Sequence, residues 1–314
     1  MSEKRLWNGR RYYSLDSFLK ETFNEKLYKL SLDGGMTCPN REGKLSYGGC
    51  IFCSEGGSGD FAAPAALGID EQIEYAKKLV ARKYDGGRYI AYFQSYTNTY
   101  APTEYLEKLF MSVIMRDDIA ALSIATRPDC LEDDKLRLLS RLTKIKPVWV
   151  ELGLQTVNRR TADLINRGYT LDCYDRAVTG LKNANTDVIT HMIVGLPHET
   201  EKDMLTTAQY IAKSGADGIK IQLLHVLKNT KLCAMYERGA FETLTEEQYV
   251  SIVADIISVL PQNMVLHRLT GDGDKNILVA PRWSGNKRKV LNQINHELKI
   301  RDIWQGKFED SKQL

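Results

Sequence analysis

Apolar and polar residues are arranged along this chain in two patterns, one typical of strands and one typical of helices. Short β-branched or apolar runs predict strands at 26–33, 88–94, 120–126, 148–155, 188–194 and 218–224. Amphipathic segments with helical spacing lie among them, at 70–84, 103–115, 132–142, 171–183 and 200–214. Several of these segments open with Asp, Thr or Pro in a capping position, as helices do. The pattern therefore predicts six strand–helix units.

Repeated strand–helix alternation requires a parallel sheet with right-handed crossovers, either doubly wound or curved into a barrel. In both arrangements the functional groups lie at the carboxyl ends of the strands. After residue 260 the pattern offers one more strand, 265–270, and a helix near 289–301. We therefore divide the chain into an N-terminal extension (1–25), an α/β unit (26–260) with a long loop at 34–61, and a C-terminal extension (261–314).

The composition is that of a globular protein. Hydrophobic residues make up 43% and charged residues 26% of the 314 positions, which excludes disordered and collagen-like chains. The opening MSEKRLWNGRRYYSL lacks the apolar stretch of a signal peptide, and no run approaches the ~18 apolar residues of a membrane span. We expect a soluble, cytoplasmic protein with no membrane partner. Six cysteines without a secretory signal indicate a reducing compartment, where thiolates stay available to metals.

Three cysteines gather in one loop after the first predicted strand. Cys50 and Cys53 form a Cys-x-x-Cys pair, and Cys38 precedes them by an eleven-residue spacer. A structural zinc site uses four protein ligands, whereas three ligands leave one coordination position for a substrate or cofactor. The count favours a site that performs chemistry. The alternative is a zinc knuckle completed by a distant histidine, namely His191, His198 or His225.

The net charge of +3 is unevenly distributed. Residues 1–29 hold seven Lys or Arg against four acidic residues, and residues 265–307 hold nine against four. Basic ends of this kind suit a phosphate-bearing partner. Solvated basic helix faces explain them equally well.

The cysteine loop resembles the cluster loop of radical SAM enzymes, in which an aromatic residue such as Phe52 stands just before the last cysteine. The commonest version has three residues between its first two cysteines, and this chain departs from it. Long spacers occur in the branch that includes the catalytic subunit of elongator. The segments ATRPDCL, VELGLQTVN, INRGYT and HMIVGLPHET are similar to that branch. QSYTNTY, KIQLLHVLKNTKL and HRLTGDGDKNILVAPRW extend the resemblance to its YtqA/YhcC-like (MnmL-type) members.

The resemblance implies a partial six-unit (βα)6 TIM-like barrel of radical SAM type with a C-terminal extension. It also implies a 4Fe-4S cluster on Cys38, Cys50 and Cys53, with S-adenosylmethionine (SAM) chelating the iron that no thiolate holds. Reductive cleavage of SAM then yields a 5′-deoxyadenosyl radical that takes hydrogen from a substrate. The expected electron donor is a flavodoxin or ferredoxin.

Two pairs of polar residues match cofactor-binding positions of the family. Gln94 and Ser95 stand where relatives bind the methionine amino group of SAM, although QSYTNTY alone is an ordinary polar loop. Glu151 and Gln155 lie at alternate positions of one strand, so both side chains point to the same face. They match contacts to the ribose and amino groups of the bound nucleoside, and the alternative is a buried structural polar pair.

Other cofactor positions rest on the resemblance more directly. Arg167 matches the residue that reaches the SAM carboxylate, a task that suits a guanidinium. The Gly-Leu-Pro segment 195–197, with Leu196 at its centre, would let backbone approach adenine. Thr126 fits the related ETRPD pattern, but Ala125 replaces its glutamate, and Glu151 is a candidate to take over that contact.

Substrate contacts are the least determined. His225 and Lys228 follow the sixth predicted strand and are candidates, with a core histidine as the alternative for His225; Arg282 and Trp283 are weaker ones. The three other cysteines, Cys130, Cys173 and Cys233, are scattered, and we expect small buried side chains.

The resemblance implies modification of the wobble uridine of tRNA, in late steps of 5-aminomethyl-2-thiouridine synthesis. A radical SAM enzyme for a small molecule or protein is the alternative, followed by a non-catalytic metal-binding protein.

Overall fold

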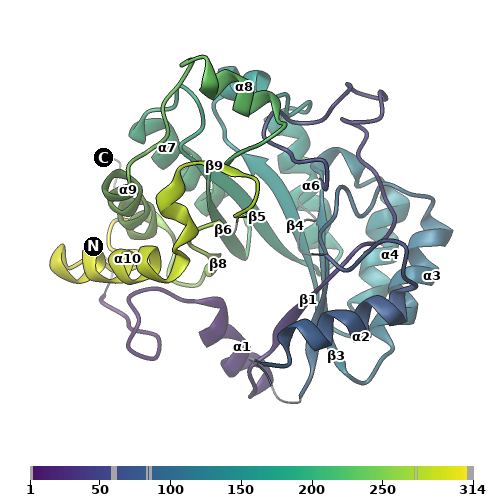
Figure 1. Cartoon of the computed structure of the whole chain (residues 1–314). Helices are drawn as coiled ribbons and strands as arrows, with labels where there is room; N and C mark the ends of the chain where they lie inside the picture. Colours follow the sequence, from purple (N-terminus) through teal and green to yellow (C-terminus); the bar gives the residue numbers. More distant parts are fainter. Residues whose placement is uncertain are drawn as a thin grey trace.

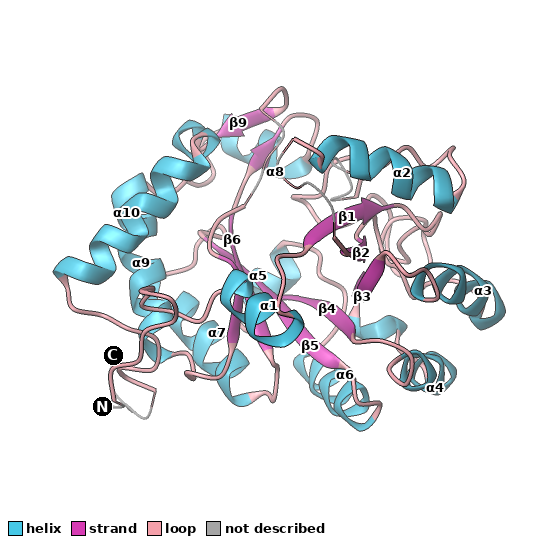
Figure 2. Cartoon of the chain, turned by 90° about the horizontal axis from the view of Figure 1, so that it is seen from below, coloured by secondary structure: helices cyan, strands magenta, loops and turns pink. Residues whose placement is uncertain are grey.

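A computed structural model describes residues 3–57, 62–82, 84, 87–271, 273 and 275–309. Its main feature is a seven-stranded parallel sheet in the order β1-β2-β3-β4-β5-β6-β8. The strands are β1 (Tyr28–Leu32), β2 (Tyr89–Phe93), β3 (Ile119–Thr126), β4 (Val148–Gln155), β5 (Asp187–Val194), β6 (Gly218–Leu223) and β8 (Val265–Arg268). The sheet curls into a partial barrel with β1 and β8 at its edges (Figures 1 and 2). The predicted α/β fold class is confirmed.

Helices cover the convex face of the sheet (Figure 1). The short helix α5 (Arg159–Leu164) follows β4, and the covering helices are α2 (Ile69–Val80), α3 (Thr103–Ile114), α4 (Asp133–Leu142), α6 (Leu171–Asn183) and α7 (Glu201–Lys213). Local chemistry sets their starts: α7 begins with a capping box in which Thr200 accepts from the Asp203 amide while the Asp203 carboxylate accepts from the Thr200 amide. Their apolar faces pack on the strands to form the main core.

The N-terminal extension closes the lower end of the barrel. Helix α1 (Leu15–Phe23) lies across that opening (Figure 2). Leu19 joins Ile90 and Trp149 in a small apolar cluster there, and the Phe18 ring meets the Trp149 ring edge-on. The Leu266 amide donates to the Tyr13 carbonyl, so the segment before α1 also covers part of the exposed edge of β8. The lower end of the barrel is therefore covered.

The C-terminal extension contributes to the same sheet, because β8 pairs with β6. Helix α9 (Glu246–Val259) packs against α7 and against α10 (Lys287–Ile300). A small antiparallel pair, β7 (Val226–Leu227) with β9 (Leu278–Ala280), lies near α8 (Lys231–Glu237). Two single-turn 3-10 helices, η1 (Pro128–Cys130) and η2 (Arg282–Gly285), complete the described elements. The predicted units 26–260 and 261–314 therefore share one sheet.

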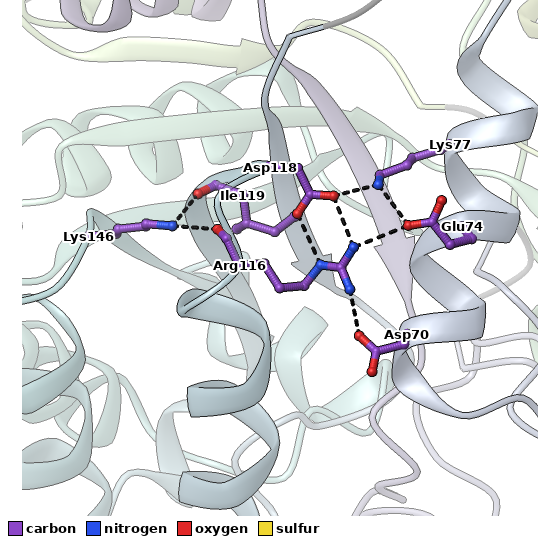
Figure 3. A network of polar contacts seen from close by, with 7 residues as sticks. All are labelled: Asp70, Glu74, Lys77, Arg116, Asp118, Ile119 and Lys146. Atoms are coloured by element: carbon purple, nitrogen blue, oxygen red, sulfur yellow. Dashed lines mark hydrogen bonds and ion pairs between the residues drawn. The ribbon is translucent and has the colours of Figure 1, made fainter.

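An ion-pair network ties α2 to the start of β3 (Figure 3). The Arg116 guanidinium contacts the carboxylates of Asp118, Asp70 and Glu74. Lys77 from α2 also contacts Asp118. From the far side, Lys146 donates to the Arg116 and Ile119 carbonyls at 2.6 and 2.7 Å. The network therefore joins the turn before β3 to helix α2.

The described part of the chain contains no helix that is both long and apolar enough to cross a membrane.

Candidate active site

A cavity of about 270 Å³ lies at the carboxyl ends of the strands. Its walls bring together the three cysteines of the loop and residues from six strands of the sheet or the turns that follow them, among them Gln94, Thr126, Gln155 and His191. This is the end of a parallel barrel at which active sites form. Residues 58–61, the end of the predicted cluster loop, lie outside the described residues.

Backbone hydrogen bonds hold the cysteine loop in place. The Arg41 amide donates to the Cys38 carbonyl at 2.8 Å, and the Cys53 amide donates to the Cys50 carbonyl at 3.1 Å. Asn40, almost fully buried, donates to the Asn166 carbonyl at 2.6 Å and lies 3.6 Å from the Cys50 sulfur. The loop is therefore tied to the segment that carries Arg167.

Cys50 and Cys53 share one hydrogen bond, which shifts the pKa values of their thiols in opposite directions. This bond and burial raise the pKa of the Cys53 thiol well above its usual value. A hydrogen bond from Cys53 lowers the pKa of the Cys50 thiol to about 7, despite its burial, and Arg127 adds to this effect. All three cysteines are free of disulfides, and thiolates are the ligand form. In the described residues no three Cys, His, Asp or Glu side chains converge on a single metal ion. A four-iron cluster differs because three of its irons each take one thiolate, so the three sulfurs need not meet at a single ion.

Below the cysteines, the barrel interior holds a buried polar network around Glu151. Its carboxylate accepts hydrogen bonds from Lys29 at 2.7 Å, Ser123 at 2.6 Å and His191 at 2.7 Å, and it pairs with Lys220. Burial alone would raise the pKa of Glu151, but the two ammonium groups hold it well below its usual range. The chain itself therefore satisfies this carboxylate, as the structural alternative expects, although Glu151 still lines the cavity.

Gln155 differs from Glu151 because part of its side chain has no partner. The register between β4 and β5 shifts after Gly153, and Gln155 adopts a φ of +69°. Its Oε1 is buried without a hydrogen-bond partner, and the same holds for the hydroxyl of Tyr169, which lines the same cavity. Buried polar groups are normally paired. The two orphaned atoms fit a bound ligand that offers hydrogen-bonding groups.

Arg167 lies in the cavity wall and is almost fully buried. Its Nη1 donates to the carbonyls of Leu154 and Thr156, and its Nε and Nη2 donate to the Tyr169 carbonyl. The guanidinium also lies 4.7 Å from the centre of the Tyr169 ring. These bonds join the end of β4 to the segment after α5. The role of Arg167 in binding the SAM carboxylate stays a prediction. Its guanidinium lines the same cavity as the three loop cysteines, as that role requires.

The remaining predicted residues divide into two groups. The cavity is lined by Phe52, Gln94, Thr126 and His225. Three others are not among its lining residues: Ser95, Leu196 and Lys228.

Local packing explains that second group. The Leu196 side chain is buried in a separate apolar cluster beneath α8. The Lys228 ammonium donates to the Asn276 carbonyl at 2.9 Å. Ser95 is buried in the turn after β2. For Leu196 the backbone contact with adenine stays a prediction. The contact of Ser95 with the methionine amino group and that of Lys228 with substrate also stay predictions.

The other three cysteines lie apart from the cluster loop. Cys130 and Cys233 are buried, as expected, whereas Cys173 in the first turn of α6 is only partly buried.

Sequence reasoning missed most of the polar floor of the cavity. Lys220 and Gln222 come from β6, Tyr92 comes from β2, and Lys29 lies beneath them on β1. The sequence did contain an indication of these residues, because polar residues at alternate positions of otherwise apolar strands point into a barrel. Without a partner strand in view, that signal does not say which of them meet.

Two family models match the chain. The radical SAM superfamily model matches residues 38–211, and the radical SAM C-terminal domain model matches residues 216–300. Because the first match covers more than half of the sequence, the chain belongs to the radical SAM superfamily. It is 46% identical over 299 residues to the uncharacterized protein YtqA of Bacillus subtilis, covering 95% of this chain and 93% of YtqA. The predicted family is confirmed.

Two further relatives belong to the elongator-like branch. A tRNA uridine(34) acetyltransferase of Methanocaldococcus jannaschii is 28% identical over 178 residues, which are 55% of this chain and 31% of that protein. The structure of Methanocaldococcus infernus Elp3 with residues 1–46 deleted superposes with a TM-score of 0.67 at 16% identity. It covers 89% of this chain and 64% of the Elp3 chain, and at that identity it shows the fold alone.

Membership of the superfamily makes this protein an enzyme that uses a 4Fe-4S cluster and SAM. The three free cysteines and the orphaned polar atoms of the cavity fit these two groups.

Proposed function

We propose that this enzyme modifies the wobble uridine of tRNA, in a late step of 5-aminomethyl-2-thiouridine synthesis. The observation that carries the proposal is the single cavity that joins the cysteine triad to Gln155 and Arg167, in a chain whose relatives include a tRNA uridine(34) acetyltransferase. The basic segments near both ends of the chain supply charge for a phosphate backbone.

Each part of the site has a distinct task in this proposal. Cys38, Cys50 and Cys53 hold the cluster, which with bound SAM supplies the radical that starts the reaction. Gln155 offers its unpaired Oε1 to the nucleoside part of the cofactor, and Arg167 places a cation near its carboxylate. The cavity walls surround the reacting groups and would limit the access of water to them.

The proposal also includes a cytoplasmic location and reduction by a flavodoxin or ferredoxin. A reducing compartment would keep the three cluster cysteines as thiols before the cluster is assembled.

Nucleoside analysis of total tRNA tests the proposed substrate. A strain that lacks this gene should accumulate the precursor of the wobble modification, and a plasmid copy should restore the product. A copy with Cys38, Cys50 and Cys53 all changed to Ala should not restore it. An unaltered profile in a strain without a redundant pathway would contradict the proposal. It would leave a small molecule or a protein as the substrate of the same radical SAM site.

A further inference from the structure

The eleven-residue spacer between Cys38 and Cys50 folds into a small hairpin, which we call the cluster-loop hairpin (residues 41–48). Glu42 and Tyr47 form an antiparallel bridge. The Gly43 amide donates to the Ser46 carbonyl at 3.1 Å, and the Gly48 amide donates to the Arg41 carbonyl at 3.2 Å. The additional residues of the spacer are therefore an ordered structure.

The cluster-loop hairpin is joined firmly to the cluster cysteines. The amides of Arg41 and Glu42 both donate to the Cys38 carbonyl, and the Leu45 amide donates to the Pro39 carbonyl at 2.9 Å. Arg41 itself lines the cavity. The hairpin tip is consequently held at a fixed position beside the cavity mouth.

The tip of the hairpin exposes two large apolar side chains to solvent. Tyr47 is 78% exposed and Leu45 is 49% exposed. The Tyr47 ring lies against Gly43, where φ is +99° and where a Cβ atom would overlap the ring. One face of the ring therefore rests on backbone, and the high exposure of the residue leaves its remaining surface to solvent. A flat ring that is supported on one side is suited to stacking.

The charge around the tip is mainly positive. Lys44 is exposed in the turn, 5.1 Å from the centre of the Tyr100 ring. Lys231, at the start of α8, brings its ammonium toward Gly48. The one acidic residue of the hairpin, Glu42, accepts a hydrogen bond from the Tyr100 hydroxyl at 2.5 Å. Cations beside an exposed aromatic ring are the combination that binds single-stranded nucleic acid.

We propose that the cluster-loop hairpin grips an RNA loop beside the nucleotide that enters the cavity. Tyr47 stacks on an unpaired base, while Lys44 and Lys231 contact phosphates. Sequence-specific RNA recognition targets unpaired, splayed bases that stack on aromatic side chains, and enzymes that act on a base take it out of the stack. This inference rests on the proposed tRNA substrate and adds the surface that holds it.

Binding of an anticodon stem–loop to the cluster- and SAM-loaded protein tests the inference. Tyr47→Ala should weaken binding roughly fivefold to 150-fold, the loss of one base–aromatic stack, and Tyr47→Phe should bind like the unchanged protein. The matched control is Tyr75→Ala, which removes a tyrosine that is 40% exposed on α2 and should leave binding unchanged. Iron content and thermal unfolding verify that each variant is folded and loaded.

Salt dependence separates stacking from charge. Tyr47→Ala should lower affinity without changing the slope of log affinity against log salt, whereas Lys44→Gln should flatten that slope by about 0.7 for a single-stranded phosphate contact. Equal RNA binding by Tyr47→Ala and the unchanged protein would overturn the inference and leave the proposed substrate intact. Slower reduction by flavodoxin with normal RNA binding would also overturn it and assign the tip to the electron donor. Failure of the unchanged protein to bind any tRNA would remove both proposals.

Discussion

Charged residues that are far apart in the sequence meet in the barrel interior only because the fold brings their strands together. Glu151 meets Lys29 and Lys220 although they come from three different strands. The motif VELGLQTVN identifies Glu151 as a site residue, but its sequence neighbours say nothing of two buried lysines. The cluster cysteines were predictable because their spacing along the sequence indicates a metal site. The contacts among the polar residues of the cavity floor depend on strand register, which the sequence alone does not show.

Glu151→Gln should destabilise the protein by about 3–5 kcal/mol, because it leaves the buried Lys220 without its counter-charge. Equilibrium denaturation would measure the loss. The control is Glu107→Gln, which removes half of an exposed pair with Arg141 and should cost at most about 1 kcal/mol. If the double change Glu151→Gln with Lys220→Met is no more stable than Glu151→Gln alone, the stranded charge is not the cause.

Arg167→Ala should weaken SAM binding by about 1.5–3 kcal/mol if the guanidinium makes a charge-assisted bond to the carboxylate. Equilibrium dialysis on the cluster-loaded protein measures this change. Because Arg167 also donates to three backbone carbonyls, thermal unfolding must be measured alongside. A folded variant with unchanged SAM affinity would show that Arg167 only supports the cavity wall.

Elements with a single apolar stripe or a continuous apolar run were predictable. The strand predicted at 148–155 has the same bounds as β4, and the other five differ from their strands by at most two residues at either end. Helix α9 was missed because ten of its fourteen residues are buried, so its apolar positions form no single stripe. Helix α1 was also missed. Its apolar side chains pack over the lower opening of the barrel, and the sequence alone does not locate that opening.

The link between α2 and β3 should make stability depend on acid pH. Hydrogen bonding to Arg116 lowers the pKa of Asp118 to about 2, with Lys77 adding to the effect. A carboxyl whose pKa is lower in the folded state stabilises the protein above about pH 4 and loses that contribution as the pH falls toward 2. Asp118→Asn should therefore lower the Tm at pH 7 and change it less at pH 3. The exposed neighbour Asp117 supplies the control, Asp117→Asn; a pH-independent deficit for Asp118→Asn would contradict this account.

At the scale of the whole molecule, basic groups lie on separate parts of the surface. The cluster-loop hairpin stands at the cavity mouth, whereas α10 packs on α9 at the β8 end of the sheet (Figure 1). Lys289 pairs there with Glu246 at 2.7 Å. A small substrate would use only the first of these surfaces, whereas a folded RNA is large enough to contact both.

Neutralising Lys287, Arg288 and Lys289 together therefore distinguishes an extended partner from a compact one. If tRNA reaches α10, the triple change to Gln should weaken its binding and flatten the salt dependence by about 0.7–0.9 log units for each lost phosphate contact. SAM cleavage without substrate should be unaffected, since none of the three residues lines the cavity. An isolated anticodon stem–loop is the sharper comparison, because it can occupy the cavity mouth without reaching α10. The triple variant should then bind the stem–loop normally and the full tRNA weakly, and equal losses for both would show that α10 acts through the site itself.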